Sequence, residues 1–159
     1  MNQKNVLILG GSSDIGVASI KLFLKNGWRV TAHYNSKKIE STIFKERKKN
    51  FLQFKFDLRK IKEFENFLKK NEKKFKEFDA FINLAGYLKP ITFEKFTTQN
   101  IYDHLNVNSI SSFLVIKTII SGMKKRKWGR IVNTSSIGTK FGGALNNFPY
   151  SLSKFNNEF

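Results

Sequence analysis

The sequence predicts an α/β protein built on a doubly wound parallel sheet with helices on both faces. Short apolar runs typical of buried strands alternate with longer stretches whose apolar residues recur at helical spacing. Glycines and polar residues follow the strand-like runs, at the edge where the carboxyl ends of parallel strands meet. One domain over residues 1–159 is expected, because this length can bury a single substantial core.

The expected elements follow each other in strict alternation. Strands are expected at 6–9, 28–34, 51–56, 78–83 and 129–134. Helices are expected at 15–25, 38–48, 98–104 and 107–125, with another along the apolar face from Ile61 to Phe75 and a last one from near Tyr150. The Asn26-Gly27 pair is a typical end of a first helix. This alternation predicts right-handed crossovers between parallel strands.

The first strand runs directly into a turn rich in glycine, from Gly10 to Gly16. A buried strand, a glycine turn and a helix N-terminus form a common phosphate site. Ser12, Ser13 and Asp14 are good N-cap residues, although the Asp14 carboxylate must point away from a bound phosphate. The spacing matches neither a strict G-x-G-x-x-G nor a G-x-x-x-x-G-K-[ST] loop, so an ordinary strand-turn-helix is the alternative.

The composition is strongly basic, with 29 Lys and Arg against 12 Asp and Glu and a net charge of +17. Such a charge fits an anionic partner or a lysine-rich solvated surface. The second interpretation is favoured, because the lysines are spread along the chain, and no nucleic-acid partner is expected. With no Cys, disulfides, thiolate chemistry and Cys-based zinc sites are excluded, and no metal site is expected. The chain shows no signal peptide and no run of ~20 apolar residues, so a cytoplasmic location away from membranes is expected.

Tyr150 and Lys154 lie four residues apart, on one face of the last expected helix. An ammonium close to a phenol favours the phenolate, which prepares the phenol for proton transfer. Ser136 follows the fifth expected strand and precedes Tyr150 by 14 residues, enough for the loop to return to the same edge of the sheet.

These motifs together resemble the short-chain dehydrogenase/reductase family, across essentially the whole chain. Residues 9–16 look like the family's T-G-x-x-x-G-I-G turn, with Leu9 for Thr and Asp14 for the middle Gly. Residues 83–86 look like N-N-A-G with Leu84 for the second Asn, residues 131–136 like the strand that ends in the catalytic Ser, and 150–154 like Y-x-x-x-K. The resemblance implies a Rossmann-type fold.

The resemblance also implies the catalytic roles. Tyr150 would exchange a proton with the substrate oxygen, and Lys154 would stabilise its phenolate and bind the nicotinamide ribose. Ser136 would hold the carbonyl oxygen, with Ser135 as the less favoured alternative, and Asn108 would position a water in a proton relay to Lys154.

Cofactor-binding residues are implied at the ends of the strands and on the last helix. They are Gly10, Ser12, Ser13, Asp14, Ile15, Gly16, Tyr34, Asn35, Ser36, Asp57, Leu58, Asn83, Ala85, Gly86, Tyr150 and Lys154. The second strand ends without an acidic residue that would pair with the ribose of NAD. Ser36, Lys37 and Lys38 could instead hold a 2′-phosphate, so NADP(H) is favoured over NAD(H).

The resemblance implies an NAD(P)-dependent oxidoreductase that moves a hydride between NADP(H) and a small carbonyl or alcohol substrate. Two alternatives are a nucleotide-binding domain without catalysis and a nucleic-acid-binding protein. Family members are longer than this chain, so we expect an N-terminal portion of a longer protein. The last strands and the substrate loop would then lie outside it, and the full-length form is expected to be a homo-oligomer.

Overall fold

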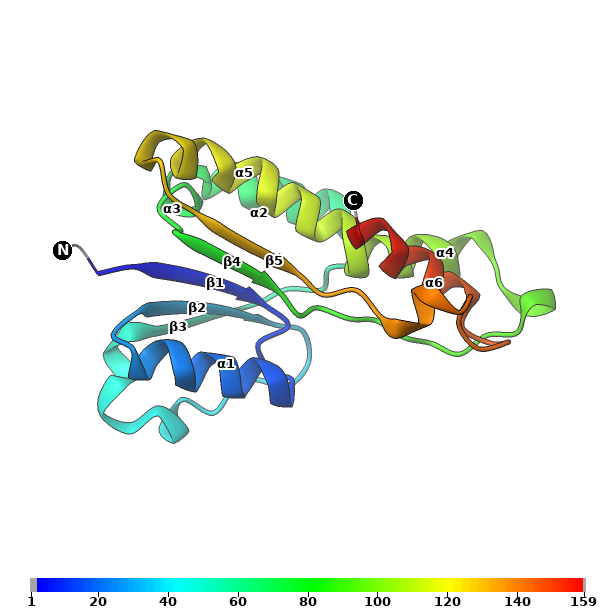
Figure 1. Ribbon diagram of the computed structural model, residues 1–159, viewed down its shortest axis with the longest axis horizontal. Coiled ribbons are helices and arrows are strands. Elements are labelled where there is room, and N and C mark those ends of the chain that lie inside the picture. Colours follow the sequence, from blue (N-terminus) through cyan, green and yellow to red (C-terminus); the bar gives the residue numbers. More distant parts are fainter. Residues whose placement is uncertain (1–2, 159) are drawn as a thin grey trace.

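The computed structural model describes residues 3–158, without the side chains of Ile43, Lys45, Glu46 and Lys48. Five parallel strands form one sheet in the order β3-β2-β1-β4-β5 (Figure 1). The strands are β1 (Asn5–Leu9), β2 (Arg29–Tyr34), β3 (Phe51–Lys55), β4 (Ala80–Asn83) and β5 (Arg130–Asn133). The doubly wound prediction is confirmed. The strand order reverses between β1 and β4, and ligands of such sheets bind beyond that point.

Helices cover both faces of the sheet (Figure 1). They are α1 (Asp14–Lys25), α2 (Ile61–Lys70), α3 (Glu72–Phe75), α4 (Thr98–Leu105), α5 (Ser111–Arg126) and α6 (Phe148–Phe155). Alternate residues of β1 point to opposite faces: Val6 and Ile8 pack with α1, and Leu7 and Leu9 pack in the core that contains α2 and α5. The α4 and α6 helices lie together beyond the carboxyl ends of the strands (Figure 1).

Three segments differ from the sequence-based expectation. Residues Ser41–Asn50 form a 3-10 helix rather than an α-helix over 38–48, because this lysine-rich segment lacks a continuous apolar face. The apolar stretch from Ile61 splits at Asn71 into α2 and α3. The last helix begins at Phe148, since Pro149 fits the first turn of a helix, where no N–H is needed.

A single helical run joins α4 and α5 through a π-helical turn, Asn106–Ile110. The run Thr98–Arg126 is long and apolar enough to cross a membrane by length and composition alone. However, Val115, Ile119 and Met123 are buried against the sheet, as in the core helix of a globular domain. At the edge of the sheet, β5 leaves Ile131 and Val132 exposed.

Candidate active site

The turn after β1 requires glycine at both of its ends. Gly10 has a φ of +72°, and a Cβ there would lie 2.6 Å from the carbonyl carbon of Leu84. A Cβ on Gly16 would lie 2.6 Å from the carbonyl oxygen of Gly11. Ser13 caps α1, because its hydroxyl accepts a hydrogen bond from the Gly16 amide at 3.1 Å. The first strand, the first helix and the loop after β4 therefore meet at this turn.

Three backbone amides of the turn remain open for a ligand. Within residues 3–158, the N–H groups of Ser12, Asp14 and Ile15 have no hydrogen-bond acceptor. They lie at the N-terminus of α1, where the helix dipole favours negative charge. The open amides therefore suit a pyrophosphate, and the glycines at both ends let the turn pack directly against neighbouring backbone.

A cleft of about 360 Å³ lies beyond the carboxyl ends of the strands. Eight of the residues predicted to bind a cofactor line it: Gly10, Ser12, Ser13, Asn35, Asp57, Leu58, Ala85 and Gly86. The remaining predicted residues of the turn and strands do not line it: Asp14, Ile15, Gly16, Tyr34, Ser36 and Asn83. Asp14 instead lines a neighbouring hollow of about 380 Å³, together with Glu40 and three lysines, Lys21, Lys37 and Lys38.

Five residues of the cleft were not predicted from the sequence: His33, Arg59, Leu84, Tyr87 and Val107. His33 is 3% exposed and bridges two strand ends. Its Nδ1 accepts from the Gly10 amide at 3.3 Å, and its Nε2 lies 2.9 Å from the Phe56 carbonyl oxygen. Burial lowers the pKa of His33, against smaller opposing effects of the Phe56 hydrogen bond and the Asp57 charge.

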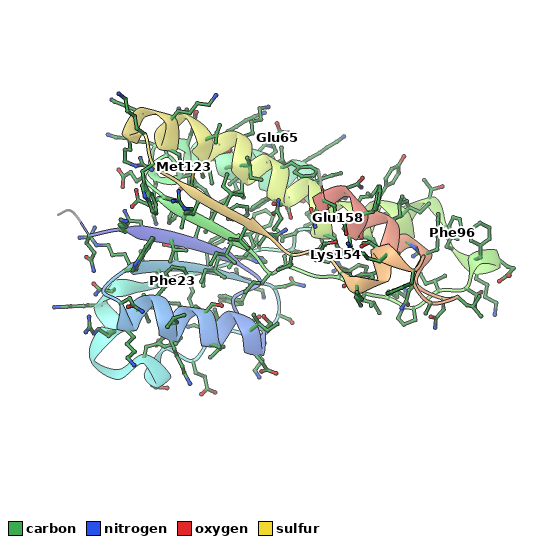
Figure 2. The ribbon with its side chains drawn as sticks, in the orientation of Figure 1. Phe23, Glu65, Phe96, Met123, Lys154 and Glu158 are labelled. Atoms are coloured by element: carbon green, nitrogen blue, oxygen red, sulfur yellow. The ribbon has the colours of Figure 1, made fainter. Side chains whose placement is uncertain are left out.

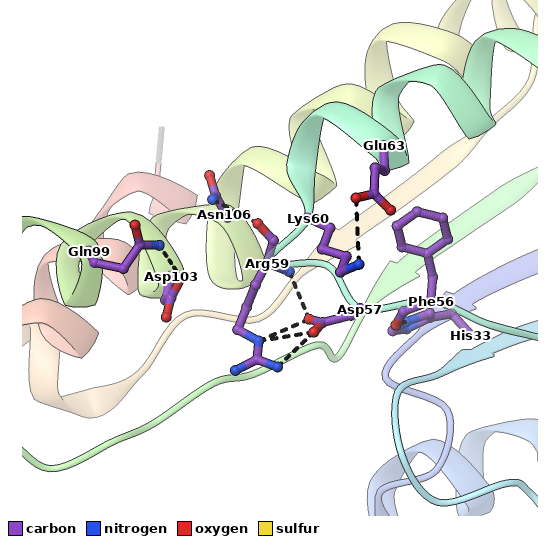
Figure 3. A network of polar contacts seen from close by, with 9 residues as sticks. All are labelled: His33, Phe56, Asp57, Arg59, Lys60, Glu63, Gln99, Asp103 and Asn106. Carbon is purple, nitrogen blue, oxygen red and sulfur yellow. Dashed lines mark hydrogen bonds and ion pairs between the residues drawn. The ribbon is translucent and has the colours of Figure 1, made fainter.

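Asp57 is held by Arg59 in a bidentate ion pair, with the closest contact at 2.7 Å (Figure 3). The hydrogen bond from Arg59 lowers the pKa of Asp57, against a smaller effect of burial. The Arg59 guanidinium also lies 6.0 Å from the centre of the Tyr87 ring. The Arg59 carbonyl accepts from Asn106 at 3.1 Å, which joins this loop to the long helical run. Because Arg59 binds both carboxylate oxygens of Asp57, both are already engaged.

Asn83 supports the cleft from beneath. Its side chain is buried, and its Oδ1 accepts from the Ala85 amide at 3.2 Å. The Asn83 Nδ2 has no hydrogen-bond partner within the described residues. Asn83 therefore shapes the loop that lines the cleft without lining it.

Lys154 and Tyr150 do not line the cleft, but Lys154 contacts Ala85, which does. Its Nζ donates to the carbonyl oxygens of Ala85 at 3.3 Å and Thr134 at 3.1 Å, and its side chain is buried. Burial lowers the pKa of this amine, and none of the described carboxylates pairs with it. Figure 2 shows Lys154 on α6, close to where the chain leaves β5.

Tyr150 precedes Lys154 by one turn of α6 and is half-buried. Its hydroxyl makes no hydrogen bond within residues 3–158, and its carbonyl accepts from the Ser153 hydroxyl at 2.7 Å. The phenol is thus free to contact a substrate, while the backbone of the same residue is held by the helix.

The two candidate serines have different surroundings. The Ser135 hydroxyl donates to the Glu158 carboxylate at 2.6 Å. The Ser136 hydroxyl accepts from the Gly138 amide at 3.2 Å and retains its own proton for a further contact. Ser135 therefore ties the β5 end to the end of the described chain, and Ser136 remains able to donate.

Asn108 lies in the π-helical turn, and its side chain is fully engaged. Its Oδ1 accepts from the Tyr87 amide at 2.6 Å, and its Nδ2 donates to the Tyr87 carbonyl and the Ser153 hydroxyl. The Asn108 carbonyl accepts from Asn157, whose Nδ2 also contacts the Thr134 carbonyl. Asn108 and Lys154 are therefore linked through Asn157 and Thr134.

Sequence comparison identifies the family. The sequence model of the short chain dehydrogenase family matches residues 4–157. Similar curated proteins include the acetoacetyl-CoA reductases of Cupriavidus necator, 30% identical, and Shinella zoogloeoides, 33% identical. The matches cover 89% and 93% of this chain but 59% and 61% of the relatives. The chain thus spans about three fifths of the length of these relatives.

Comparison with solved structures agrees with the family match. ElxO with NADP bound is 27% identical, with a TM-score of 0.78 over 98% of this chain and 64% of ElxO. A variant of actinorhodin polyketide ketoreductase with NADPH is 26% identical, with a TM-score of 0.79 over 97% of this chain and 60% of that one. An NADH-dependent reductase complexed with NAD shares the fold at 21% identity, with a TM-score of 0.81 over 97% of this chain and 68% of that one. The chain belongs to the short chain dehydrogenase family.

Proposed function

We propose that the protein containing this chain is an NADP(H)-dependent oxidoreductase that interconverts a carbonyl and an alcohol, with Tyr150 as the general acid and base. One observation carries the proposal. The buried Lys154 amine reaches the Ala85 carbonyl at the cleft, one helical turn from the unbonded Tyr150 hydroxyl. A binding domain without chemistry has no need of a buried, unpaired amine beside a free phenol.

We expect a dinucleotide to bind with its pyrophosphate at the turn after β1 and its nicotinamide toward Lys154. The open amides of Ser12, Asp14 and Ile15 would bind the pyrophosphate, and the loop from Asp57 to Arg59 would lie beside the adenine. Ala85 and Gly86 would line the path toward Lys154. The nicotinamide, when bound, supplies or accepts the hydride, and the protein orients it and moves the proton.

The proton is handled by side chains at the β5 and α6 end. In the reducing direction, the Tyr150 hydroxyl donates its proton to the substrate oxygen, and the Lys154 ammonium stabilises the resulting phenolate. The Ser136 hydroxyl donates a hydrogen bond to the same oxygen, which strengthens as negative charge develops there. In the oxidising direction, the phenolate takes the proton back from the alcohol.

The preference for NADP(H) is supported by charge near the end of β2. The hollow lined by Lys21, Lys37 and Lys38 adjoins the phosphate-binding turn, and both include Ser12. Two of the similar solved structures, at 26% and 27% identity, hold NADPH or NADP. NAD(H) is the alternative cofactor.

A 3-oxoacyl thioester is the first substrate class to test. Two proteins at 30% and 33% identity are acetoacetyl-CoA reductases.

The decisive experiment follows NADPH oxidation by the protein over a panel of carbonyl compounds that includes acetoacetyl-CoA. Tyr150→Phe should lower the turnover number about 100- to 10,000-fold, because it removes the proton donor while keeping the ring. The affinity for NADPH, measured by fluorescence titration, should change little. Turnover in Tyr150→Phe equal to the wild type would remove Tyr150 from this role.

The cofactor preference has its own test. Reversing two charges with Lys37→Glu and Lys38→Glu should raise the dissociation constant of NADPH about tenfold or more and leave that of NADH nearly unchanged. Lys73→Glu with Lys74→Glu, in α3, changes the net charge equally and should affect neither constant. Equal weakening of both dinucleotides would contradict the 2′-phosphate assignment.

A dinucleotide-binding protein without turnover is the second candidate. It is favoured by Asn157, whose amide occupies the carbonyls of Asn108 and Thr134 beside Lys154. This candidate predicts NADPH binding with no oxidation of NADPH by any carbonyl in the panel.

A further inference from the structure

His33 makes two side-chain hydrogen bonds that together select one protonation state. Its Nδ1 faces the Gly10 N–H at 3.3 Å, and its Nε2 faces the Phe56 carbonyl oxygen at 2.9 Å. A backbone amide only donates and a carbonyl only accepts, so Nδ1 must be bare and Nε2 must carry the proton. Only the neutral Nε2–H tautomer satisfies both contacts.

These two bonds tie together the two sides of the cofactor cleft. Gly10 begins the turn that carries the open amides, and Phe56 directly precedes Asp57 (Figure 3). The His33 carbonyl also accepts from the Gly11 amide at 2.9 Å. On its other side, Gly10 packs against the backbone of Leu84, where no Cβ would fit. The turn is therefore held between β2 and the loop after β4, and His33 supplies the first of these supports.

We propose that His33 is a positioning residue for dinucleotide binding, whose neutral tautomer holds the phosphate-binding turn in place and whose protonation releases it. The inference rests on the proposed function and adds to it a pH-sensitive element. A proton on Nδ1 would bring two donors, Nδ1–H and the Gly10 N–H, face to face. The turn would then keep its backbone bond to β2, from the Gly11 amide to the His33 carbonyl, but lose the side-chain bond at Gly10, and the affinity for the dinucleotide would fall.

The charged groups near His33 are compatible with an imidazole that is neutral until the pH falls. The ionisable side chains on the segments packed against it are Asp14 after β1, Tyr34 on β2, Lys55, Asp57 and Arg59 at and after the end of β3, and Tyr87 after β4. Asp57 favours the protonated imidazole, but its carboxylate is already paired with Arg59, and burial of His33 is the larger effect on its pKa. Burial and the contact of Nδ1 with the Gly10 N–H both favour the neutral imidazole, which becomes protonated only as the pH falls below its lowered pKa.

The tautomer can be measured directly, because the chain has only two histidines. His104 is a matched internal control with the opposite arrangement: its Nδ1 lies 2.6 Å from the Asn100 carbonyl, and its Nε2 accepts from the Lys89 amide at 3.2 Å. In 15N-labelled protein, long-range imidazole spectra should give Nε2–H for His33 and Nδ1–H for His104 at pH 7.5. The Gly10 amide shift should follow the titration of His33. An Nδ1–H tautomer for His33, or a Gly10 amide shift that stays constant while His33 titrates, overturns the proposal.

Two variants separate positioning from packing. His33→Asn places an amide oxygen near the position of Nδ1 and cannot titrate, whereas His33→Phe fills the volume without an acceptor. At pH 8, the dissociation constant of NADPH should rise about tenfold in His33→Phe and stay within about threefold of the wild type in His33→Asn. As the pH falls through the titration of His33 followed by NMR, wild-type affinity should fall relative to that of His33→Asn, which corrects for protonation of the cofactor's own phosphate.

Each result has a defined meaning. Wild-type affinity that does not fall relative to His33→Asn across the measured titration of His33, or unchanged affinity in His33→Phe, overturns the proposal. If His33→Phe does not fold, the pH profile of His33→Asn decides alone. A protein that binds no dinucleotide at any pH contradicts the proposed function itself, and the tautomer and the Gly10 titration then decide the His33 contact separately.

Discussion

The segments proposed to hold the cofactor and those proposed to carry catalysis differ in how completely their buried side chains are hydrogen-bonded. On the cofactor side, formed by the segments 10–16, 33–36 and 56–59, His33 uses both nitrogens, and Asp57 is paired with Arg59. On the catalytic side, residues 134–158, three buried polar atoms have no partner within the described residues: Asn147 Oδ1, Ser151 Oγ and Asn157 Oδ1. Buried polar atoms normally find a partner, so the catalytic side has unused bonding capacity.

The apolar surface shows the same contrast. The segment between β5 and α6 exposes Ile137, Phe141 and Leu145, of which Leu145 is 98% exposed. The cofactor side rests instead on the buried strands β1 and β2. We infer that dinucleotide binding and turnover depend on separate sets of contacts, so single substitutions can affect one without the other.

Among substitutions that test whether binding and turnover are separate, Lys154→Met is expected to have the largest effect. The turnover number should fall about 100- to 10,000-fold, because Tyr150 loses the cation that stabilises its phenolate. The affinity for NADPH should fall by about tenfold or less, since the phosphate-binding turn is untouched. Methionine also removes a buried charge, so the melting temperature should be kept or raised.

Steady-state kinetics and thermal unfolding would test this prediction. Lys140→Met changes an exposed lysine in the same segment and serves as the control. A turnover number in Lys154→Met equal to that of the wild type would contradict the proposed role of Lys154 in stabilising the Tyr150 phenolate.

Gly10→Ala is expected to have a smaller effect, and to act on stability and NADPH affinity rather than on turnover. The added Cβ meets the Leu84 backbone at 2.6 Å at a φ of +72°, so the turn must shift. We expect a loss of about 2–4 kcal/mol in unfolding free energy and a marked loss of NADPH affinity. Gly27→Ala has a similar φ of +79° but open space around it, so it should cost only about 1 kcal/mol and leave NADPH affinity intact.

Urea unfolding and fluorescence titration of both glycine variants measure the difference. Equal effects at Gly10 and Gly27 would mean that backbone strain alone, and not the contact with Leu84, governs the turn.

The smallest effect is expected from Asp57→Asn. The pKa of Asp57 is lowered in the folded protein, so its contribution to stability is present above the unfolded pKa of ~3.9 and is lost as the pH falls through the folded value. The pair is partly exposed to solvent, and its contribution should be below about 1 kcal/mol.

The difference in unfolding free energy between wild type and Asp57→Asn should therefore be present at pH 7 and disappear in strong acid. Glu63→Gln breaks a looser exposed pair with Lys60, at 3.5 Å, and should show a smaller difference at pH 7. A wild-type advantage that grows as the pH falls would contradict this assignment.

The motifs predicted the sheet and the main turn because they depend on local patterns. Apolar runs mark buried strands, and Gly10 and Gly16 mark places where no Cβ fits. The contacts of His33, Arg59 and Tyr87 could not be predicted, since each joins segments that are far apart in the sequence. The polar residue His33 within a strand expected to be buried was the only available signal.

For the catalytic side, the residue types and their spacing were predictable but their bonding was not. The Tyr150 and Lys154 pair follows from helical spacing, whereas the acceptors of Lys154 come from β4 and β5 ends. That Asn108 positions a water stays a prediction, and the contacts of its side chain with Tyr87 and Ser153 were not foreseen. These contacts depend on the π-helical turn, which leaves no periodic pattern in the sequence.

The π-helical turn makes the two halves of the continuous helical run Thr98–Arg126 face different neighbours. A π turn holds one more residue than an α turn, so it rotates everything after it by about 100° around the helix axis. The α4 end consequently faces α6, while the α5 end faces α2 and α3. Deleting a single residue between 106 and 110 would realign the two halves and turn one of them away from its neighbours.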